Sequence, residues 1–277
     1  MRKPTVLIVG LGQIGGSLAA ALSRRRLARV LGATRRRETA RRALRMGIVA
    51  EAGTDLRAVP AADVVVLATP VRTLLDQIPP VAAAAATGAV LTDVGSTKKD
   101  VLEAFRRARP RAAVIGGHPM AGHERAGLDG CDPDLFEDRP WILIPGPGAT
   151  LRAGRTLERL VRGVGARPLW MDDPARHDLA VARVSHLPYL LAYALMEQPP
   201  LELRAAGNSF RDATRVALSD PEMVLDFLLT NRRPIRRAVG ELVRRLRELA
   251  GRVSRGDEAS LRRRLQEARL RRLRRVR

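Results

Sequence analysis

The sequence predicts an α/β fold, with an N-terminal Rossmann-like doubly wound parallel sheet followed by an all-helical dimerisation domain. Short apolar runs alternate with helical patterns over residues 1–172, which is typical of βαβ units and a parallel sheet. The first apolar run leads directly into the glycine-rich stretch "GLGQIGGS". Beyond Asp172-Asp173-Pro174 no convincing strand pattern remains, so the second half is predicted to be helical.

The first domain is assigned to residues 1–172 and is predicted to bind a dinucleotide. Its apolar runs predict strands at Thr5–Val9, Arg29–Ala33, 63–69, 89–94, 112–115, 141–144 and 168–171. Helical spacing between the early strands predicts helices at 13–25, 37–46, 72–85 and 98–108. Ligands of such a sheet bind beyond the carboxyl ends of the strands, so the loops found there are expected to form the functional site.

The second domain is assigned to residues 173–277. Asp173 suits the N-cap of its first helix and Pro174 the first helical position. The helices are expected at 174–197, 221–231, 233–253 and 258–274. Residues 187–196 are nearly all apolar, which predicts a helix buried on all sides and a homodimer core. The leucines of 261–277 do not form one stripe, so this arginine-rich end is expected to be a frayed tail.

The composition restricts the function classes. A net charge of +21 fits a polyanion partner, but the arginines run through the whole chain and only 3% of residues are aromatic, which weighs against nucleic acid. A single cysteine, Cys131, excludes an internal disulfide framework and fits a cytoplasmic protein. The N-terminus lacks the features of a signal peptide, the longest apolar stretches are interrupted before 18 residues, and no metal site is expected.

The glycine-rich loop predicts a dinucleotide site. Gly10, Gly12 and Gly15 have the G-x-G-x-x-G spacing, which allows a tight turn, close approach to a pyrophosphate and close packing of helix on strand. Gln13 and Ile14 begin the following helix, whose free N–H groups and positive dipole end face the phosphates. A preceding strand, a following helix and a second strand about 20 residues on supply the expected context.

The end of the second strand predicts which dinucleotide is used. An enzyme specific for NAD usually carries a carboxylate there, whereas this chain has Thr34, Arg35 and Arg36. A hydroxyl and guanidinium groups suit a 2′-phosphate, which favours NADP over NAD, although arginine is common throughout the chain. Thr69 and Pro70, in the loop after strand 63–69, are expected to line the same cofactor.

Two further strand-end loops hold the candidate catalytic residues. Ser96 and Lys98 lie in "GSTKK" and His118 lies in "GGHPMAG", so the three side chains are expected to converge near the nicotinamide. An imidazole with a pKa of about 6.5 is mostly neutral at pH 7 and can act as a base, although a structural role is as compatible with the spacing. Ser96 alternatively suits a helix N-cap. Apart from Lys3, the only lysines are Lys98 and its neighbour, in a chain that otherwise uses arginine.

At these motifs the sequence resembles the prephenate and arogenate dehydrogenases of tyrosine biosynthesis. The resemblance covers nearly the whole chain, through "VGLGQIGGSLA", "TDVGSTK", "GGHPMAG", "VSHLPYLLAYAL" and "FRDATRVALSDPEM" in that order. It implies a dehydrogenase domain followed by a helical dimerisation domain. The implied reaction is an oxidative decarboxylation, in which hydride leaves C4 of a cyclohexadienol for a nicotinamide while the ring carboxylate departs as CO2.

The resemblance also implies roles for individual residues. His118 would accept a hydrogen bond from the C4 hydroxyl, Ser96 would orient that histidine, and Lys98 would lie near the substrate. In the helical half, His186 would lie near the substrate, turned toward the cleft by a kink at Pro188. The remaining expected substrate contacts are two arginines of "FRDATR", Arg215 at the ring carboxylate and Arg211 at a second basic position.

One position departs from the family pattern. Val224 stands where the family often has Trp, which puts the packing around the substrate in doubt. Two alternatives remain open. The first is a related Rossmann enzyme acting on a β-hydroxy acid or cyclic imine. The second is a nucleic-acid-binding protein that uses the basic C-terminal tail.

Overall fold

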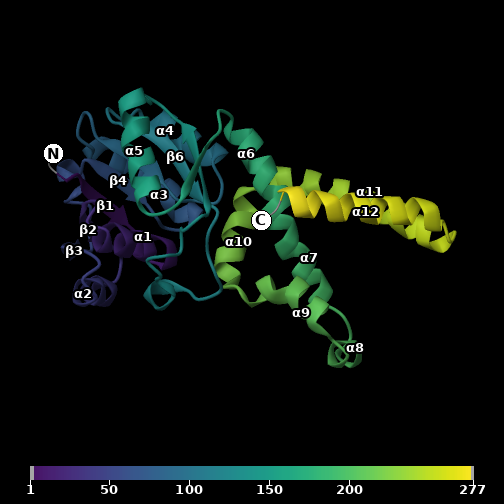
Figure 1. The fold of residues 1–277 in the computed structure, drawn as a ribbon. Coiled ribbons are helices and arrows are strands. Elements are labelled where there is room, and N and C mark those ends of the chain that lie inside the picture. Colours follow the sequence, from purple (N-terminus) through teal and green to yellow (C-terminus); the bar gives the residue numbers. More distant parts are fainter. Residues whose placement is uncertain (1–2, 276–277) are drawn as a thin grey trace.

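The computed structural model of the chain describes residues 3–275, which form a sheet domain and a helical domain (Figure 1). The strands, in chain order, are β1 Thr5–Val9, β2 Arg29–Ala33, β3 Glu51–Gly53, β4 Val64–Leu67, β5 Val90–Asp93, β6 Ala113–Pro119, β7 Pro140–Pro145 and β8 Arg167–Trp170. The helices of the sheet domain are α1 Gln13–Arg24, α2 Arg37–Arg45, α3 Val71–Ala84, α4 Lys99–Ala108 and α5 Leu151–Gly163. Single 3-10 turns, η1 Val59–Ala61 and η2 Gly127–Gly130, complete it.

One eight-stranded sheet has the order β3-β2-β1-β4-β5-β6-β7-β8. Its first six strands are parallel, β7 pairs antiparallel with β6, and β8 pairs parallel with β7. The order reverses between β1 and β4, and this is the point at which a doubly wound sheet binds its ligand. The predicted doubly wound fold is therefore confirmed, with two strands added at one edge.

Helices cover both faces of the sheet, because strands buried on both faces need apolar partners on each side. Apolar side chains of α1, α2 and α5 pack in one core cluster, and those of α3 and α4 pack in the other. The central strands are buried along their lengths; β4, for example, has no exposed residue in "VVVL". Strand β3 and helix α5 have no counterpart among the predicted elements, and β3 has only three residues with no apolar alternation.

Strand β6 differs from the prediction in a way that bears on the site. The parallel ladder with β5 ends at Ile115, yet the strand continues to Pro119 because β7 pairs antiparallel with residues 115–119. His118 therefore lies within a strand, opposite Ile142, and not in a loop after it. A residue held by a ladder on one side has a fixed backbone, so its side-chain direction is well defined.

The helical domain begins after β8. Its elements are α6 Pro174–Val181, a π-helical turn Ala182–His186, α7 Leu187–Met196, α8 Pro200–Arg204, α9 Asn208–Thr214, a 3-10 turn Arg215–Leu218, α10 Pro221–Thr230, α11 Arg232–Ser254 and α12 Glu258–Arg275. Asp173 caps α6 through a bond from the Ala175 N–H to its side chain (2.7 Å), as predicted. Helices α11 and α12 lie side by side and project from the body (Figure 1).

Two expectations for this domain differ from the single chain. Among the described residues only Ala192 of α7 is buried, and Leu191 and Met196 are exposed, so burial of α7 on all sides is not reached within one chain. The arginine-rich end is not frayed as far as Arg275, because α12 folds back on α11 with a contact between Arg264 and Glu248 (3.2 Å). The last two residues of that predicted tail lie outside the described residues.

The run Pro174–Met196 is long and apolar enough, by length and composition, to cross a membrane, contrary to the expectation that no segment would be. Core helices of soluble proteins meet the same criterion. This run carries His177 and Asp178, whose buried side chains bond to strand β6 and to the start of α4. A helix joined in this way to a sheet domain is part of that fold, and a bilayer could not surround it.

Candidate active site

The glycine-rich loop lies at the switch point between β1 and β4. Gly10 adopts φ +103°, and a Cβ there would lie 2.7 Å from the backbone of Ala68. A Cβ on Gly15 would lie 1.9 Å from the Gly10 carbonyl oxygen, so this glycine permits close contact between helix and strand. In contrast, nothing lies within 4 Å of a Cβ built on Gly12. Helix α1 starts at Gln13 without a side-chain cap, which leaves its first N–H groups for a ligand. These features fit a pyrophosphate.

Gln13 and Ile14 were expected to bind the cofactor, and their side chains are otherwise engaged. The Gln13 amide donates to the carbonyl oxygens of His123 (2.9 Å) and Arg125 (2.7 Å), which ties the loop after β6 to the start of α1. Ile14 packs against the core cluster that includes α1. Only the main-chain groups of these two residues remain for a phosphate.

The other expected cofactor residues surround the same loop. The Gly10 N–H donates to the Ala33 carbonyl (2.7 Å), so the end of β2 lies beside the glycines. Thr34, Arg35 and Arg36 follow immediately, and both arginines are exposed. On the other side, a Cβ on Gly10 would meet Thr69 Cγ2 at 2.8 Å, and Pro70 is the N-cap residue of α3. The cofactor residues predicted from the sequence thus meet at one edge of the sheet.

Lys98 is buried beneath the strand-end loops, close enough to His118 to lower its pKa. Its ammonium group is fully buried and pairs with the fully buried carboxylate of Asp93 at the end of β5. Asp93 also accepts from the N–H groups of Gly95 (2.9 Å) and Gly117 (3.2 Å). A Cβ on Gly116 would lie 3.2 Å from the Lys98 side chain, and such close walls favour a compact ammonium over a planar guanidinium. Lys98 therefore lies beneath the strand-end loops and does not face open space.

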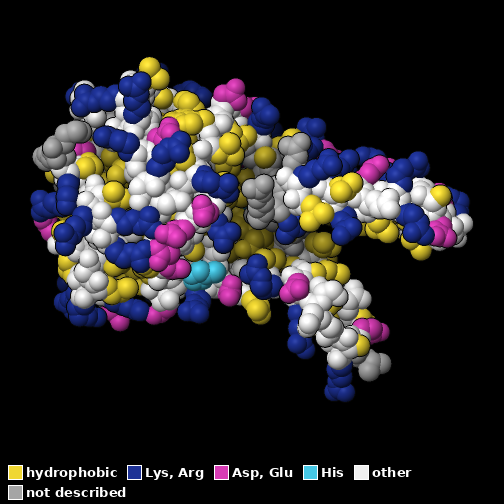
Figure 2. All heavy atoms as spheres, in the orientation of Figure 1, with side chains coloured by type: hydrophobic (Ala, Val, Ile, Leu, Met, Phe, Trp, Pro, Cys, Tyr) yellow, Lys and Arg dark blue, Asp and Glu magenta, His cyan; other side chains and the backbone are white. Residues whose placement is uncertain are grey.

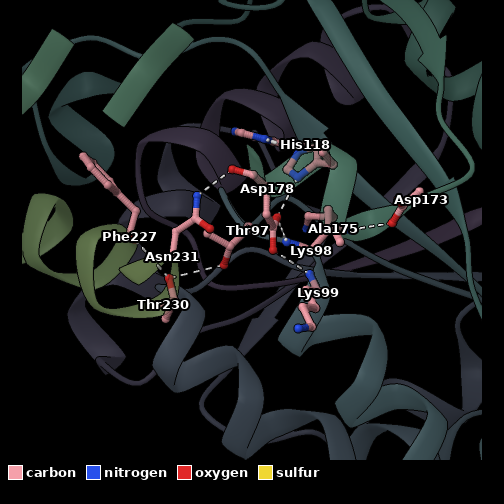
Figure 3. Close-up of polar contacts among 12 residues, drawn as sticks. Thr97, Lys98, Lys99, His118, Asp173, Ala175, Asp178, Phe227, Thr230 and Asn231 are labelled. Atoms are coloured by element: carbon pink, nitrogen blue, oxygen red, sulfur yellow. Dashed lines mark hydrogen bonds and ion pairs between the residues drawn. The ribbon is translucent and has the colours of Figure 1, made fainter. Parts of the chain in front are cut away.

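His118 makes its polar contact with the helical domain. Its Nδ1 lies 2.9 Å from Nε2 of His177, and Nδ1 of His177 lies 2.8 Å from Oδ1 of Asp178 (Figure 3). His118 is 8% exposed, and His177 is fully buried. Burial lowers the pKa of His118 well below its ordinary value, and the neighbouring His177 and Lys98 lower it further. The His118 imidazole is consequently neutral at pH 7.

Asp178 joins the two domains. Its carboxylate accepts from the backbone N–H groups of Lys98 (2.7 Å) and Lys99 (3.0 Å) at the start of α4 (Figure 3). The cap of α4 thus comes from α6 and not from Ser96, which makes no side-chain cap there. Asp226 of α10 acts in the same way on α3, accepting from the N–H groups of Val71 (2.6 Å) and Arg72 (3.1 Å). Two carboxylates of the helical domain therefore hold two helices of the sheet domain.

His186, which was expected near the substrate, is buried against α10 and Asn231 of the helical domain. It is 1% exposed, its ring stacks on Phe227 at a centroid distance of 4.5 Å, and its Nδ1 lies 3.1 Å from Nδ2 of Asn231. Burial lowers the pKa of His186 to about 4. The helix does not break at Pro188; it widens into the π turn just before it, because Pro188 has no N–H to donate to the preceding turn.

The two arginines expected at the substrate are exposed. Arg215 begins the 3-10 turn after α9 and lies 3.6 Å from Glu124 of the loop that follows His118. Arg211 lies one turn earlier on α9 and is also exposed. Arg215 is therefore on the same side of the molecule as the His118 loop, reached across the domain boundary. Val224, at the position of the family Trp, is buried within α10.

Four residues of this region were missed as site residues in the sequence: Asp93, His177, Asp178 and Asn231. For Asp93 a signal was available, since it ends an apolar strand, where functional carboxylates are common. His177 and Asp178 lie in the middle of α6, and the sequence around them has an ordinary helical pattern. Their importance depends on contacts with residues 59 to 80 positions away.

A phosphate-binding glycine loop at the switch point of a doubly wound sheet, next to a neutral buried imidazole, defines a class of protein: the dinucleotide-dependent dehydrogenases. Among residues 3–275 no group of three His, Cys, Asp or Glu side chains could hold a metal ion.

Comparison with known families narrows this class. Residues 18–169 match the nucleotide-binding domain of prephenate dehydrogenase, and residues 173–267 match the prephenate dehydrogenase dimerization domain. The chain belongs to the prephenate dehydrogenase family.

Individual relatives agree with this assignment. The chain is 34% identical to a prephenate dehydrogenase of Bacillus subtilis over 94% of its own length and 72% of the relative. It is similar to the structure of the Aquifex aeolicus prephenate dehydrogenase in complex with hydroxyphenyl propionate and NAD+, with 30% identity, a TM-score of 0.89, and coverage of 99% and 98% of the two chains. The Synechocystis arogenate dehydrogenase is also similar, with 30% identity, a TM-score of 0.82, and coverage of 96% and 97%.

More distant structures share only the fold. A pyrroline-5-carboxylate reductase from Coxiella burnetii and a 3-hydroxyisobutyrate dehydrogenase from Mycobacterium tuberculosis each reach a TM-score of 0.54, at 14% and 18% identity. They correspond to the cyclic-imine and β-hydroxy-acid alternatives, and likeness at that level gives no support for either activity.

Proposed function

We propose that the chain catalyses the oxidative decarboxylation of prephenate to a 4-hydroxyphenyl product, with NADP+ preferred over NAD+. The observation that carries the proposal is the neutral, buried imidazole of His118, fixed in strand β6 and placed across the sheet edge from the glycine loop. Arogenate is the second candidate substrate, favoured by the likeness to the Synechocystis enzyme.

The first chemical requirement is a proton acceptor for the C4 hydroxyl. His118 meets it because its pKa is lowered, so that the ring keeps a free lone pair at neutral pH. A bound nicotinamide supplies the acceptor for the hydride that leaves C4. Loss of the hydride and of the hydroxyl proton turns C4–O into a carbonyl. The ring carboxylate then leaves as CO2, and its bonding electrons pass through the ring to the carbonyl oxygen, which takes up a proton and leaves an aromatic phenol. Ser96, half-buried beside this region, is proposed to orient the hydroxyl.

The second requirement is to bind two carboxylates. Arg215 and Arg211 are proposed for this task, since exposed guanidinium groups near the His118 loop can pair with a dianion. Arg215 now contacts Glu124 only at 3.6 Å, a separation that leaves its donors free for a closer anion. His186 is proposed to contact the substrate through the ring nitrogen that Asn231 does not occupy.

Prephenate and arogenate differ by a keto and an ammonium group on the side chain, and an ammonium group needs an acidic partner. The buried carboxylates of this region are already engaged: Asp93 with Lys98, and Asp178 and Asp226 with backbone N–H groups. This supports prephenate, because a keto acid needs no carboxylate beside it.

The preference for NADP+ is proposed from Arg35 and Arg36. They stand where a carboxylate would bind the ribose of NAD, and no hydrogen bond or ion pair engages either side chain within the described part of the chain. Replacing Arg36 by Ser should raise KM for NADP+ by about 10- to 150-fold, as expected for the loss of a charged hydrogen bond of about 1.5–3 kcal/mol. Arg41→Ser, an exposed arginine on the same helix, is the control.

The assembly is proposed to be a homodimer of a cytoplasmic enzyme. The second domain matches a dimerization domain, and the exposed apolar side chains of α7 and α10 need a partner surface. The division at residues 1–172 and 173–277 is proposed to separate cofactor binding from dimerisation. On the face of the molecule drawn in Figure 2, lysine and arginine are spread over both domains. They do not form there one concentrated patch of the kind that would favour nucleic acid.

The decisive experiment supplies prephenate and arogenate separately, each with NADP+ and with NAD+, and follows absorbance of the reduced nicotinamide. The expected result is the highest kcat/KM with prephenate and NADP+. Activity with arogenate but not with prephenate would show that arogenate is the substrate and that the proposed preference for prephenate is wrong. Absence of turnover with both substrates and both cofactors would overturn it.

A further inference from the structure

We propose that His177 and Asp178 are positioning residues that fix His118 in the tautomer with its proton on Nδ1, so that Nε2 is the atom that accepts the substrate proton. This inference rests on the proposed role of His118 as base. It adds two residues of the helical domain to a site whose base lies in the sheet domain. Helix α6 would then determine the chemical state of the base as well as its position.

The proton positions follow from the contacts, starting at Asp178. Its carboxylate faces three N–H donors: the backbone groups of Lys98 and Lys99 and Nδ1 of His177. A carboxylate oxygen accepts, so the His177 proton must lie on Nδ1. His177 has a lowered pKa because of burial, and the ring is neutral at pH 7. A neutral imidazole has one proton, which leaves Nε2 of His177 as an acceptor.

The next contact transmits this assignment to His118. Nε2 of His177 lies 2.9 Å from Nδ1 of His118, and two lone pairs cannot share that distance, so Nδ1 of His118 must donate. The single proton of the neutral ring is then on Nδ1, and Nε2 keeps its lone pair. In residues 3–275 Nε2 makes no hydrogen bond, so it remains for a substrate hydroxyl. A base needs both a neutral ring and the free nitrogen on the substrate side.

His186 is held in the opposite state by a separate contact. The Asn231 amide nitrogen donates to the Asp178 carbonyl oxygen (2.8 Å), and this acceptor fixes the amide orientation. The same nitrogen lies 3.1 Å from Nδ1 of His186, which must therefore accept, leaving the proton of that ring on Nε2. The site thus presents one accepting and one donating imidazole, both set by the residue pair Asp178 and Asn231.

The first test needs neither cofactor nor substrate. The chain has four histidines, so the protein labelled with 15N-histidine gives a simple spectrum in which protonated and unprotonated ring nitrogens are well separated. His118→Gln assigns the resonances. At pH 7 we expect His118 and His177 to be protonated on Nδ1 and His186 on Nε2. A protonated Nε2 on His118 would overturn the proposal, whatever the enzyme acts on.

The second test uses a matched pair of variants in the full-length enzyme. His177→Gln keeps an amide oxygen to accept from His118 and an amide nitrogen to donate to Asp178, whereas His177→Leu keeps neither. We expect His177→Leu to lower kcat about a hundredfold or more, within the range typical of a lost general base, with little change in KM for NADP+. His177→Gln should restore most of that loss. Equal loss in both variants at equal stability, or full kcat in His177→Leu, contradicts the proposal.

The pH profile separates positioning from support of the fold. The ionisable groups that act on His118 are His177 of α6, Lys98 before α4 and His186 of the π turn, and His177 is in turn faced by Asp178, Lys98 and Asp93. In His177→Leu nothing fixes the proton of the neutral His118 ring, which can then lie on Nδ1 or on Nε2. The apparent pKa of the acid limb of kcat/KM should therefore change. A purely structural role would lower the whole profile without moving it. Wild-type activity with prephenate or arogenate tests the proposed function separately, so failure of one idea is distinguishable from failure of the other.

Discussion

Asp226 offers the sharpest test of how the two domains are joined. It is 5% exposed, and its carboxylate, carried by α10, accepts from the N–H groups of Val71 and Arg72 at the start of α3. Replacing it by Ala removes a helix cap worth about 0.5–2 kcal/mol. It also leaves the buried N–H of Val71 without a partner, which costs about 1–3 kcal/mol. We therefore expect Asp226→Ala to lower the free energy of unfolding by about 2–4 kcal/mol.

The control for this change is on the same helix. Asp220 caps α10 itself, by accepting from the Glu222 N–H (2.9 Å), and it is exposed. Asp220→Ala should cost about 1 kcal/mol, since water can reach the freed N–H. Urea unfolding followed by circular dichroism measures both variants. If Asp226→Ala is no more destabilising than Asp220→Ala, the view that α10 holds the sheet domain through this carboxylate is wrong.

Three further predictions concern the glycine loop and the histidines. Gly15→Ala should abolish binding of the reduced cofactor, measured by nicotinamide fluorescence quenching, because the added Cβ would lie 1.9 Å from the Gly10 carbonyl oxygen. Gly12→Ala should disturb the folded structure much less than Gly15→Ala, because nothing lies within 4 Å of its added Cβ. The buried His186, with its pKa lowered from 6.5 to about 4, binds fewer protons than the unfolded chain; stability should be complete above pH 6.5 and fall by about 3 kcal/mol as pH drops to 4, and His186→Gln should flatten this dependence in urea titrations. The acid limb of kcat/KM should lie below pH 6.5, because burial keeps His118 neutral there; a limb above 6.5 contradicts the assigned base.

The local features of this protein could be predicted from its sequence. Alternating apolar runs and helical spacing indicated the doubly wound sheet, because burial on both faces leaves a direct pattern in the chain. The glycines of the phosphate loop were recognisable because only glycine tolerates the φ of Gly10 and the contact at Gly15. His118 could be found because it lies in a short motif at a strand end, where loops converge.

The sequence could not show which polar side chains contact one another. Lys98 was expected near the substrate, and only the folded sheet shows that its buried ammonium group pairs with Asp93. His177 and Asp178 look like ordinary residues in the middle of a helix, and only the folded chain brings them against His118 and the start of α4. The spacing of apolar residues indicates which face of a helix or strand is buried. A hydrogen bond between side chains far apart in the chain produces no such spacing, so it cannot be predicted in this way. The sequence therefore determined the fold and the position of the candidate base, while the tertiary structure decided which nitrogen of that imidazole is engaged by His177.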